Sequence, residues 1–174
     1  MNVHVRETLL SEETIRNRVR ELADRIANDH AGHEVLLVGI LRGAFIFLAD
    51  LVRQLRIPSK IDFIAVSSYG KGIESGAVRL IMDLRDDIAG RHVILVEDIV
   101  DSGRTLTYLR EMLSARHPAS LQICALVRKP ERLKIDLPVD YLGFDIPDVW
   151  VVGYGLDCMD QYRGLPYIAA VEVS

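Results

Sequence analysis

The most regular feature of this sequence is the alternation of short apolar runs with amphipathic segments. The continuous apolar run 35–40 is typical of a strand that is buried on both faces of a sheet, and 92–96 and 121–127 are also predicted to be buried strands. The predicted strands are 35–40, 61–66, 78–82, 92–96, 121–127, 141–144 and 150–152. Because helical segments separate many of them, the pattern favours an α/β fold with a largely parallel sheet.

The segments between these runs have the periodicity of helices. Ser11 precedes two glutamates and predicts a helix N-cap, and Gly32 lies just beyond the expected end of that helix. One face of this helix is apolar and consists of Ile15, Val19, Leu22, Ala23 and Ile26. Two further helices are predicted at 44–55, which Pro58 follows, and at 103–115.

Length and composition fit a single globular domain. The chain has 174 residues, of which 49% are apolar and 26% charged, and these values exclude wholesale disorder. The formal net charge of −4 argues against a dedicated nucleic-acid binder, because such proteins have a basic surface. Cys124 and Cys158 show no paired spacing, which excludes a disulfide framework and a cysteine-based zinc site.

No segment predicts a membrane partner. The apolar stretch 35–52 is interrupted by Arg42 and Asp50, and it fits a strand, a turn and a helix better than a membrane span. The first residues lack the apolar core of a signal peptide. We therefore expect a soluble, cytoplasmic protein with reduced thiols.

The most informative chemistry lies in segment 93–105. A buried strand leads to Glu97 and Asp98, and Asp101 follows just before Ser-Gly-Arg-Thr at 102–105, where a helix begins. The N–H groups of such a helix start, with its hydroxyls, form a site for an anion. Carboxylates beside an anion site would repel the ligand unless they bound a metal or sugar hydroxyls, so the segment favours a phosphorylated sugar with Mg²⁺. An ordinary strand-to-helix turn capped by Asp or Ser is the structural alternative.

This segment resembles the phosphoribosyl-pyrophosphate (PRPP) motif of type I phosphoribosyltransferases. Orotate, uracil, adenine and 6-oxopurine enzymes share versions of the motif, as do some transcription regulators. Further segments narrow the choice, namely Leu41–Ala44, Ser67–Gly70, Arg128–Pro130, Trp150–Asp157 and Tyr162-Arg163. Together and in this order they resemble the hypoxanthine-guanine branch of the family, from about residue 35 to the C-terminus. The resemblance implies the type I fold in one domain, 1–174, with a small hood formed by the terminal segments.

The resemblance also implies a reaction. The 5-phosphoribosyl group of PRPP is transferred, with Mg²⁺, to N9 of hypoxanthine or guanine, and the products are IMP or GMP and pyrophosphate. The residues that correspond to the 5-phosphate site are Asp101, Ser102, Gly103, Arg104 and Thr105. Glu97 and Asp98 correspond to the residues that face the ribose hydroxyls and Mg²⁺. Asp101 corresponds to the general base or acid at purine N7, although loop aspartates often only order a turn.

The same resemblance assigns the purine contacts. Lys129 corresponds to the lysine that donates to the 6-oxo group, although taken alone it would be an ordinary surface lysine. Trp150 would stack on the base with Ile99 on the opposite face, although a lone tryptophan is more often a core residue. The Val151 backbone would contact the purine edge. Asp157 is assigned both to this part of the site and to Mg²⁺ carrying pyrophosphate.

The pyrophosphate contacts are implied at Arg42, Gly43 and Arg163. Arg42 departs from the lysine that is frequent at its position. Ser68 and Tyr69 correspond to a flexible loop that closes over the reacting centre, and the polar, glycine-bearing segment 67–76 predicts such a loop.

Other interpretations remain open at this point. A regulator or a pyrimidine enzyme could have the same fold, and a 6-oxopurine enzyme that prefers xanthine would share these motifs. The family also implies a homodimer or homotetramer, for which the apolar helix at 44–55 is a candidate interface.

Overall fold

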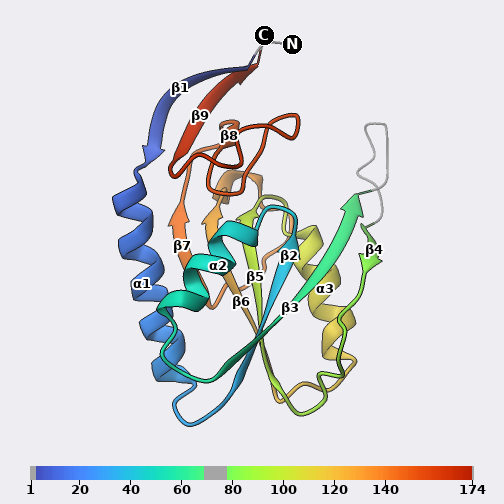
Figure 1. Cartoon of the computed structure of the whole chain (residues 1–174). Coiled ribbons are helices and arrows are strands. Elements are labelled where there is room, and N and C mark those ends of the chain that lie inside the picture. The colour runs from blue at the N-terminus through green and yellow to red at the C-terminus, as the bar shows by residue number, and fades with distance from the viewer. Residues whose placement is uncertain (1–2, 69–77, 174) are drawn as a thin grey trace.

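A computed structural model describes residues 3–68 and 78–173, which form two sheets with helices around the larger one (Figure 1). The larger sheet has the strand order β4-β3-β2-β5-β6-β7. Its strands are β2 Val35–Leu41, β3 Ser59–Ser68, β4 Val78–Met82, β5 His92–Val100, β6 Ser120–Arg128 and β7 Tyr141–Asp145. Only the β3–β4 pair is antiparallel among the neighbours in this described sheet. The predicted α/β fold with a largely parallel sheet is therefore confirmed.

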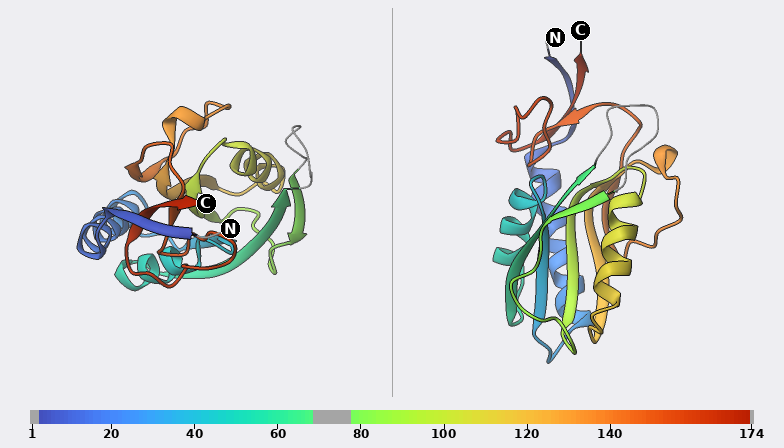
Figure 2. Two further views of the ribbon diagram at one scale, coloured as in Figure 1. Left: turned by 90° about the horizontal axis from the view of Figure 1, so that it is seen from above. Right: turned by 90° about the vertical axis from the view of Figure 1, so that its right-hand side faces the viewer.

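Helices cover both faces of this sheet (Figure 2). Helices α1 Glu12–Asp29 and α2 Phe45–Gln54 lie on one face, and α3 Arg104–Ser114 lies on the other. Successive side chains of a strand point to opposite faces, so Leu37 packs under α1 and α2 whereas Val38 packs under α3. Because helices cover both faces of the sheet, the central strands β2, β5 and β6 are largely apolar.

The first helix begins as the sequence predicts. The Ser11 hydroxyl accepts a hydrogen bond from the Thr14 backbone N–H at 3.1 Å, which is the geometry of an N-cap. Every residue of the predicted apolar face is buried, namely Ile15, Val19, Leu22, Ala23 and Ile26. No helix in the described part of the chain is long and apolar enough to cross a membrane.

The terminal segments form a small antiparallel sheet above the carboxyl ends of the parallel strands (Figure 1). It consists of β1 Val3–Leu10, β9 Ile168–Val173 and β8 Val151–Val152, in that order. The sequence analysis predicted neither β1 nor β9 as a strand. Most of β1 is exposed and carries charged residues, so the strand has no apolar run and depends on its pairing with β9.

The strand that carries the candidate carboxylates is longer than predicted. We expected it to end at residue 96, but β5 continues to Val100 because its parallel pairing with β6 persists to Val100 and Arg128. Glu97 and Asp98 therefore belong to a buried strand and are not part of the loop after it. Their place within the paired strand explains their low exposure.

Candidate active site

Three chain segments meet at the carboxyl edge of the sheet, and two glycines allow the contact. A Cβ atom on Gly43, in the β2–α2 connection, would lie 1.7 Å from Oδ2 of Asp98. A Cβ atom on Gly155, after β8, would lie 2.0 Å from the Gly43 carbonyl oxygen, and its φ of +100° also favours glycine. The Leu41–Arg42 peptide that leads into this contact is cis. The backbone thus places Arg42, Asp98 and the 155–163 segment around one point.

The start of α3 borders a cavity of about 250 Å³, which we name the α3 cavity. Its lining residues are Glu97, Asp98, Ile99, Val100, Asp101, Ser102, Gly103, Thr105 and Leu106. Gly103 has φ +82° and precedes the helix without any side-chain cap, so the Asp or Ser cap considered from the sequence is wrong. Uncapped N–H groups at a helix start are suited to bind an anion. The predicted phosphate segment therefore surrounds a cavity, with Arg104 as the first residue of the helix.

Glu97 and Asp98 form a buried acidic pair beside this cavity. Their exposed fractions are only 7% and 8%. Burial raises the pKa of Glu97 well above its usual range, and the neighbouring Asp98 charge adds to this effect. Burial also raises the pKa of Asp98, although the Arg163 charge opposes part of that shift.

This pair fits a cation and sugar hydroxyls. Buried carboxylates require compensation, which a divalent cation or hydroxyl donors would supply. The described residues hold no group of three potential metal ligands. Mg²⁺ typically binds one or two carboxylates and completes its shell with substrate oxygens and water, so two adjacent carboxylates are sufficient for it.

A second cavity, of about 190 Å³, lies beside the first, and we name it the Trp150 cavity. It is lined by Asp101, Lys129, Arg132, Asp148, Val149 and Trp150. Trp150 is 67% exposed, so the alternative of a core tryptophan is wrong. Lys129 is only 6% exposed, so it is not an ordinary surface lysine either, and its Nζ lies 3.7 Å from Oδ1 of Asp148.

The other predicted purine contacts, Ile99, Val151 and Asp157, do not line the Trp150 cavity itself. Ile99 is half-buried and lines the α3 cavity, and Val151 is buried at the start of β8, next to Trp150. The backbone at Trp150 is paired with β9, because the Trp150 carbonyl oxygen accepts a hydrogen bond from Val171 N–H at 2.8 Å. Asp157 instead pairs with Arg163, away from the residues that line the Trp150 cavity.

Asp101 is the one predicted residue that lines both cavities. Its Oδ1 is buried and lies 2.5 Å from Nε of Arg132, in an ion pair without the alignment of a hydrogen bond. The side chain as a whole is still 45% exposed, so the remainder of the carboxyl group is accessible to a ligand. The carboxylates of Asp101 and Asp148 raise the pKa of Arg132, which keeps this guanidinium charged.

The sequence analysis did not identify Arg132 or Asp148 as site residues. Arg132 follows Lys129 at a spacing of one helical turn, in the short 3₁₀ helix Pro130–Arg132, and its Nη1 lies 3.5 Å from Oδ1 of Asp148. A charged residue at such a spacing is common on exposed helices, so the sequence carried no distinctive signal for it.

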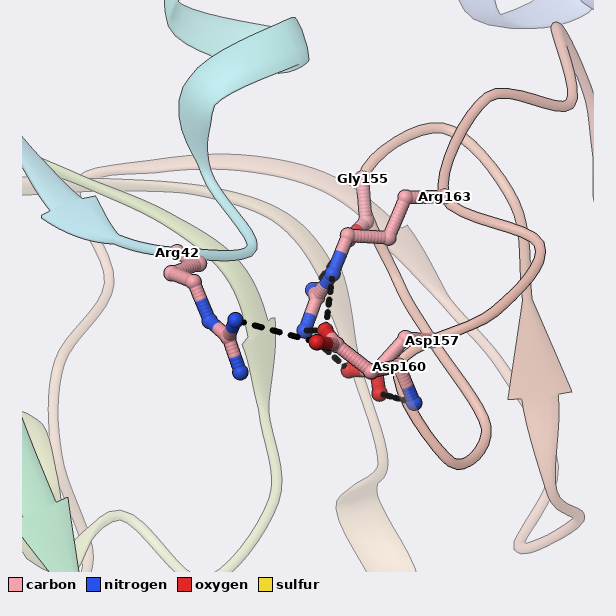
Figure 3. Close-up of polar contacts among 5 residues, drawn as sticks. All are labelled: Arg42, Gly155, Asp157, Asp160 and Arg163. Atoms are coloured by element: carbon pink, nitrogen blue, oxygen red, sulfur yellow. Dashed lines mark hydrogen bonds and ion pairs between the residues drawn. The ribbon is translucent and has the colours of Figure 1, made fainter.

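Arg42, Asp157 and Arg163 come together in one charged network (Figure 3). Arg163 donates to the Gly155 carbonyl oxygen at 2.7 Å and pairs with Oδ1 of Asp157 at 2.7 Å. Asp160, which the sequence analysis did not identify, pairs with both arginines. The hydrogen bond from Arg163 and the charge of Arg42 lower the pKa of Asp160.

The predicted flexible-loop residues are only partly described. Ser68 is the last residue of β3, and its backbone pairs with Val78 of β4. Tyr69 lies outside the described residues. The role assigned to both by resemblance therefore stays a prediction.

Comparisons with known proteins agree on one family. A model of the phosphoribosyl transferase domain matches residues 6–158. A hypoxanthine phosphoribosyltransferase of Salmonella typhimurium is 46% identical over 171 residues, which cover 97% of this chain and 96% of that protein. A hypoxanthine-guanine phosphoribosyltransferase of Mycobacterium bovis is 44% identical over 175 residues, with 97% and 87% covered.

Solved structures give the same result. The crystal structure of a hypoxanthine-guanine phosphoribosyltransferase from Bacillus anthracis superposes with a TM-score of 0.93 at 44% identity, and the match covers 98% of this chain and 100% of that one. A hypoxanthine phosphoribosyltransferase from Staphylococcus aureus has a TM-score of 0.93 at 43% identity, with 97% and 92% covered.

Proposed function

This chain belongs to the phosphoribosyltransferase family, and we propose that it is a purine salvage enzyme of the hypoxanthine-guanine type. It transfers the 5-phosphoribosyl group of PRPP to N9 of hypoxanthine or guanine and releases pyrophosphate. The bond between the anomeric carbon and pyrophosphate breaks, and the bond from that carbon to N9 forms.

The position of Asp101 between the two cavities is the observation that carries this proposal. A purine in the Trp150 cavity and a ribose phosphate in the α3 cavity would meet at this carboxylate. The proton on the purine must leave as N9 attacks, and a carboxylate within reach can accept it from N7. Asp101 is thus the proposed catalytic residue, which accepts the proton from purine N7.

The α3 cavity would hold the phosphorylated sugar. Ser102, Gly103, Arg104 and Thr105 bind the 5-phosphate, together with the Asp101 backbone and the N–H groups at the start of α3. Glu97 and Asp98, which line the same cavity, would hold the ribose hydroxyls and Mg²⁺. Bound Mg²⁺ neutralises charge that develops on the departing pyrophosphate.

The pyrophosphate would lie where the three segments meet. Arg42, Gly43 and Arg163 contact its oxygens, and Asp157 contributes a ligand to the Mg²⁺ that accompanies it. The resemblance assigns Ser68 and Tyr69 to the closing of the site, which would exclude water and protect PRPP from hydrolysis.

The Trp150 cavity would hold the base. Lys129 donates to the 6-oxo group, Trp150 stacks on one face of the ring, and Ile99 packs on the other. The Val151 backbone would complete the contacts to the purine edge, whereas Asp157, which does not line this cavity, would act through Mg²⁺ and pyrophosphate.

Replacement of Trp150 by alanine is expected to weaken base binding. Stacking of a base on an aromatic side chain contributes about 1–3 kcal/mol, and the lower half of this range applies because only one face of the exposed ring is covered, so KM for hypoxanthine should rise roughly 5- to 30-fold. The KM for PRPP should stay close to that of the parent. Trp150→Phe, which preserves stacking, serves as the control, and equal KM values for all three proteins would remove Trp150 from the base site.

The proposal extends to assembly and location. The chain would act as one domain and form a homodimer or homotetramer. Exposed apolar side chains at Phe45 of α2 and Ile61 and Phe63 of β3 are suited to bury surface between subunits. Both cysteines are buried free thiols, which supports a cytoplasmic location.

Initial rates with PRPP and MgCl₂ test the function. The bases to compare are hypoxanthine, guanine, xanthine, adenine and uracil, with EDTA as the metal-free control. Turnover of hypoxanthine or guanine that EDTA abolishes, with adenine and uracil inert, is the expected result. Preferred turnover of xanthine would redefine the base, whereas turnover of uracil, or PRPP binding without turnover of any base, would overturn the proposal.

A further inference from the structure

Asp160 lies between the two arginines that would bind pyrophosphate, and it occupies both of them (Figure 3). Its Oδ2 accepts from Nη1 of Arg42 at 3.1 Å. Its Oδ1 accepts from Nε and Nη2 of Arg163 at 3.3 Å and 3.1 Å. One carboxylate thus joins the β2–α2 connection to the segment after β8, with one oxygen for each arginine.

The guanidinium of Arg163 has little capacity left for another anion. It donates to the Gly155 carbonyl oxygen through Nη1, and it pairs with Asp157 and Asp160 through Nη2. An incoming pyrophosphate would therefore have to replace an existing carboxylate partner. Asp160 is the partner that yields more easily, because its side chain is 58% exposed and that of Asp157 is 31% exposed.

Nothing else in the network depends on the Asp160 charge. The Asp160 backbone N–H donates to Oδ2 of Asp157 at 2.7 Å, and this bond holds the turn without the side chain. The partner on the other side, Arg42, is 70% exposed and belongs to a connection that packs through Gly43. The carboxylate of Asp160 can therefore leave both arginines without disturbing the segment that carries them.

We propose that Asp160 is an affinity-determining residue that competes with pyrophosphate for Arg42 and Arg163. The inference rests on the proposed function, because it takes these two arginines as the pyrophosphate site. In the free enzyme the carboxylate holds the two guanidinium groups, and in the complex it is displaced and its negative charge faces the ligand. Both effects weaken the binding of PRPP and of pyrophosphate, and the second favours release of the product.

Asp160→Asn tests this competition, since asparagine retains the shape and loses the charge. Titration calorimetry with pyrophosphate and MgCl₂ should give a dissociation constant roughly 3- to 10-fold lower than that of the parent, as expected for two solvent-exposed ion pairs. The gain should shrink at high ionic strength, because exposed charges are screened. The dissociation constant for hypoxanthine, which carries no charge, should not change.

Asp83→Asn is the matched control. Asp83 also pairs with an arginine, Arg116, at 2.7 Å and is also partly exposed, but it lines neither cavity. This variant has the same change in net charge, so its affinity for pyrophosphate should equal that of the parent. A similar gain in both variants would show a general charge effect and would overturn the inference.

A double substitution localises the effect. With Arg42→Gln in the background, Asp160→Asn should yield a smaller gain, because only Arg163 is left to be released. An undiminished gain would contradict the competition. If Asp160→Asn weakens pyrophosphate binding, the carboxylate organises the two arginines and the inference is wrong while the proposed function stands. If the parent itself does not bind pyrophosphate, the proposed pyrophosphate site fails together with the inference.

Discussion

Asp101→Asn should lower kcat about 10²- to 10⁴-fold, which is the usual contribution of a general acid or base. The carboxylate lies where the α3 cavity and the Trp150 cavity join, and an amide in its place cannot accept the purine proton. The amide oxygen can still face Arg132, so the local geometry should persist. Binding of PRPP, measured by titration calorimetry, should therefore change little while turnover falls.

The control for this substitution is Asp145→Asn. Asp145 pairs with Arg128 at 2.7 Å, as Asp101 pairs with Arg132, but it lines neither cavity. Its kcat should equal that of the parent. If kcat of Asp101→Asn equals that of the parent as well, the alternative that Asp101 only orders the turn holds. Loss of PRPP binding in parallel with turnover would instead indicate a damaged phosphate site.

The sheet and its helices could be predicted because their signals are local. Val93 to Val96 are apolar without interruption, since both faces of β5 are covered, and Ser11 marks a helix start by its own hydrogen bond. The strands of the hood have no such signal. β1 carries His4, Arg6 and Glu7, and it becomes a strand only because β9, more than 150 residues later, pairs with it.

The candidate site shows the same contrast between local signals and contacts over long sequence distances. Its anion-binding part is one continuous segment, 97–106, and the sequence displays it directly. Several ion pairs of the site join residues that are distant along the chain, such as Arg42 with Asp160 and Arg132 with Asp101. Aspartate and arginine are abundant surface residues, so their pairing emerges only when the fold brings the segments together.

Burial likewise could not be predicted for Lys129 and Trp150. A lysine is usually exposed and a tryptophan usually buried, yet here Lys129 is 6% exposed and Trp150 is 67% exposed. The backbone explains the reversal. Lys129 N–H donates to the Val100 carbonyl oxygen at 2.9 Å and is held at the end of the sheet, whereas Trp150 precedes the short strand β8 at the rim.

The buried ammonium of Lys129 leads to the second large expected effect, a loss of base selectivity. Lys129→Met preserves the length of the side chain and removes the donor to the purine 6-oxo group. A hydrogen bond from a charged donor contributes about 1.5–3 kcal/mol, so kcat/KM for hypoxanthine should fall roughly 10- to 150-fold. Adenine carries an amino group at this position, and the ammonium would oppose that donor. Removing it should therefore leave adenine unaffected or improve it, and the ratio of the two kcat/KM values is the measurement.

Arg128→Met provides a matched control for this change, because it removes the neighbouring cation. Arg128 is engaged in two hydrogen bonds with Asp145, at 2.7 Å and 2.9 Å, and it does not line the Trp150 cavity. Its selectivity should equal that of the parent. The fold should survive Lys129→Met, because Asp148 is 38% exposed and retains Arg132 as a partner, so neither charge is left buried and alone. A change in the hypoxanthine-to-adenine ratio that is confined to Lys129→Met would assign recognition of the 6-oxo group to this lysine. If both variants keep the ratio of the parent, the backbone at the rim of the cavity selects the base and the assignment of Lys129 is wrong.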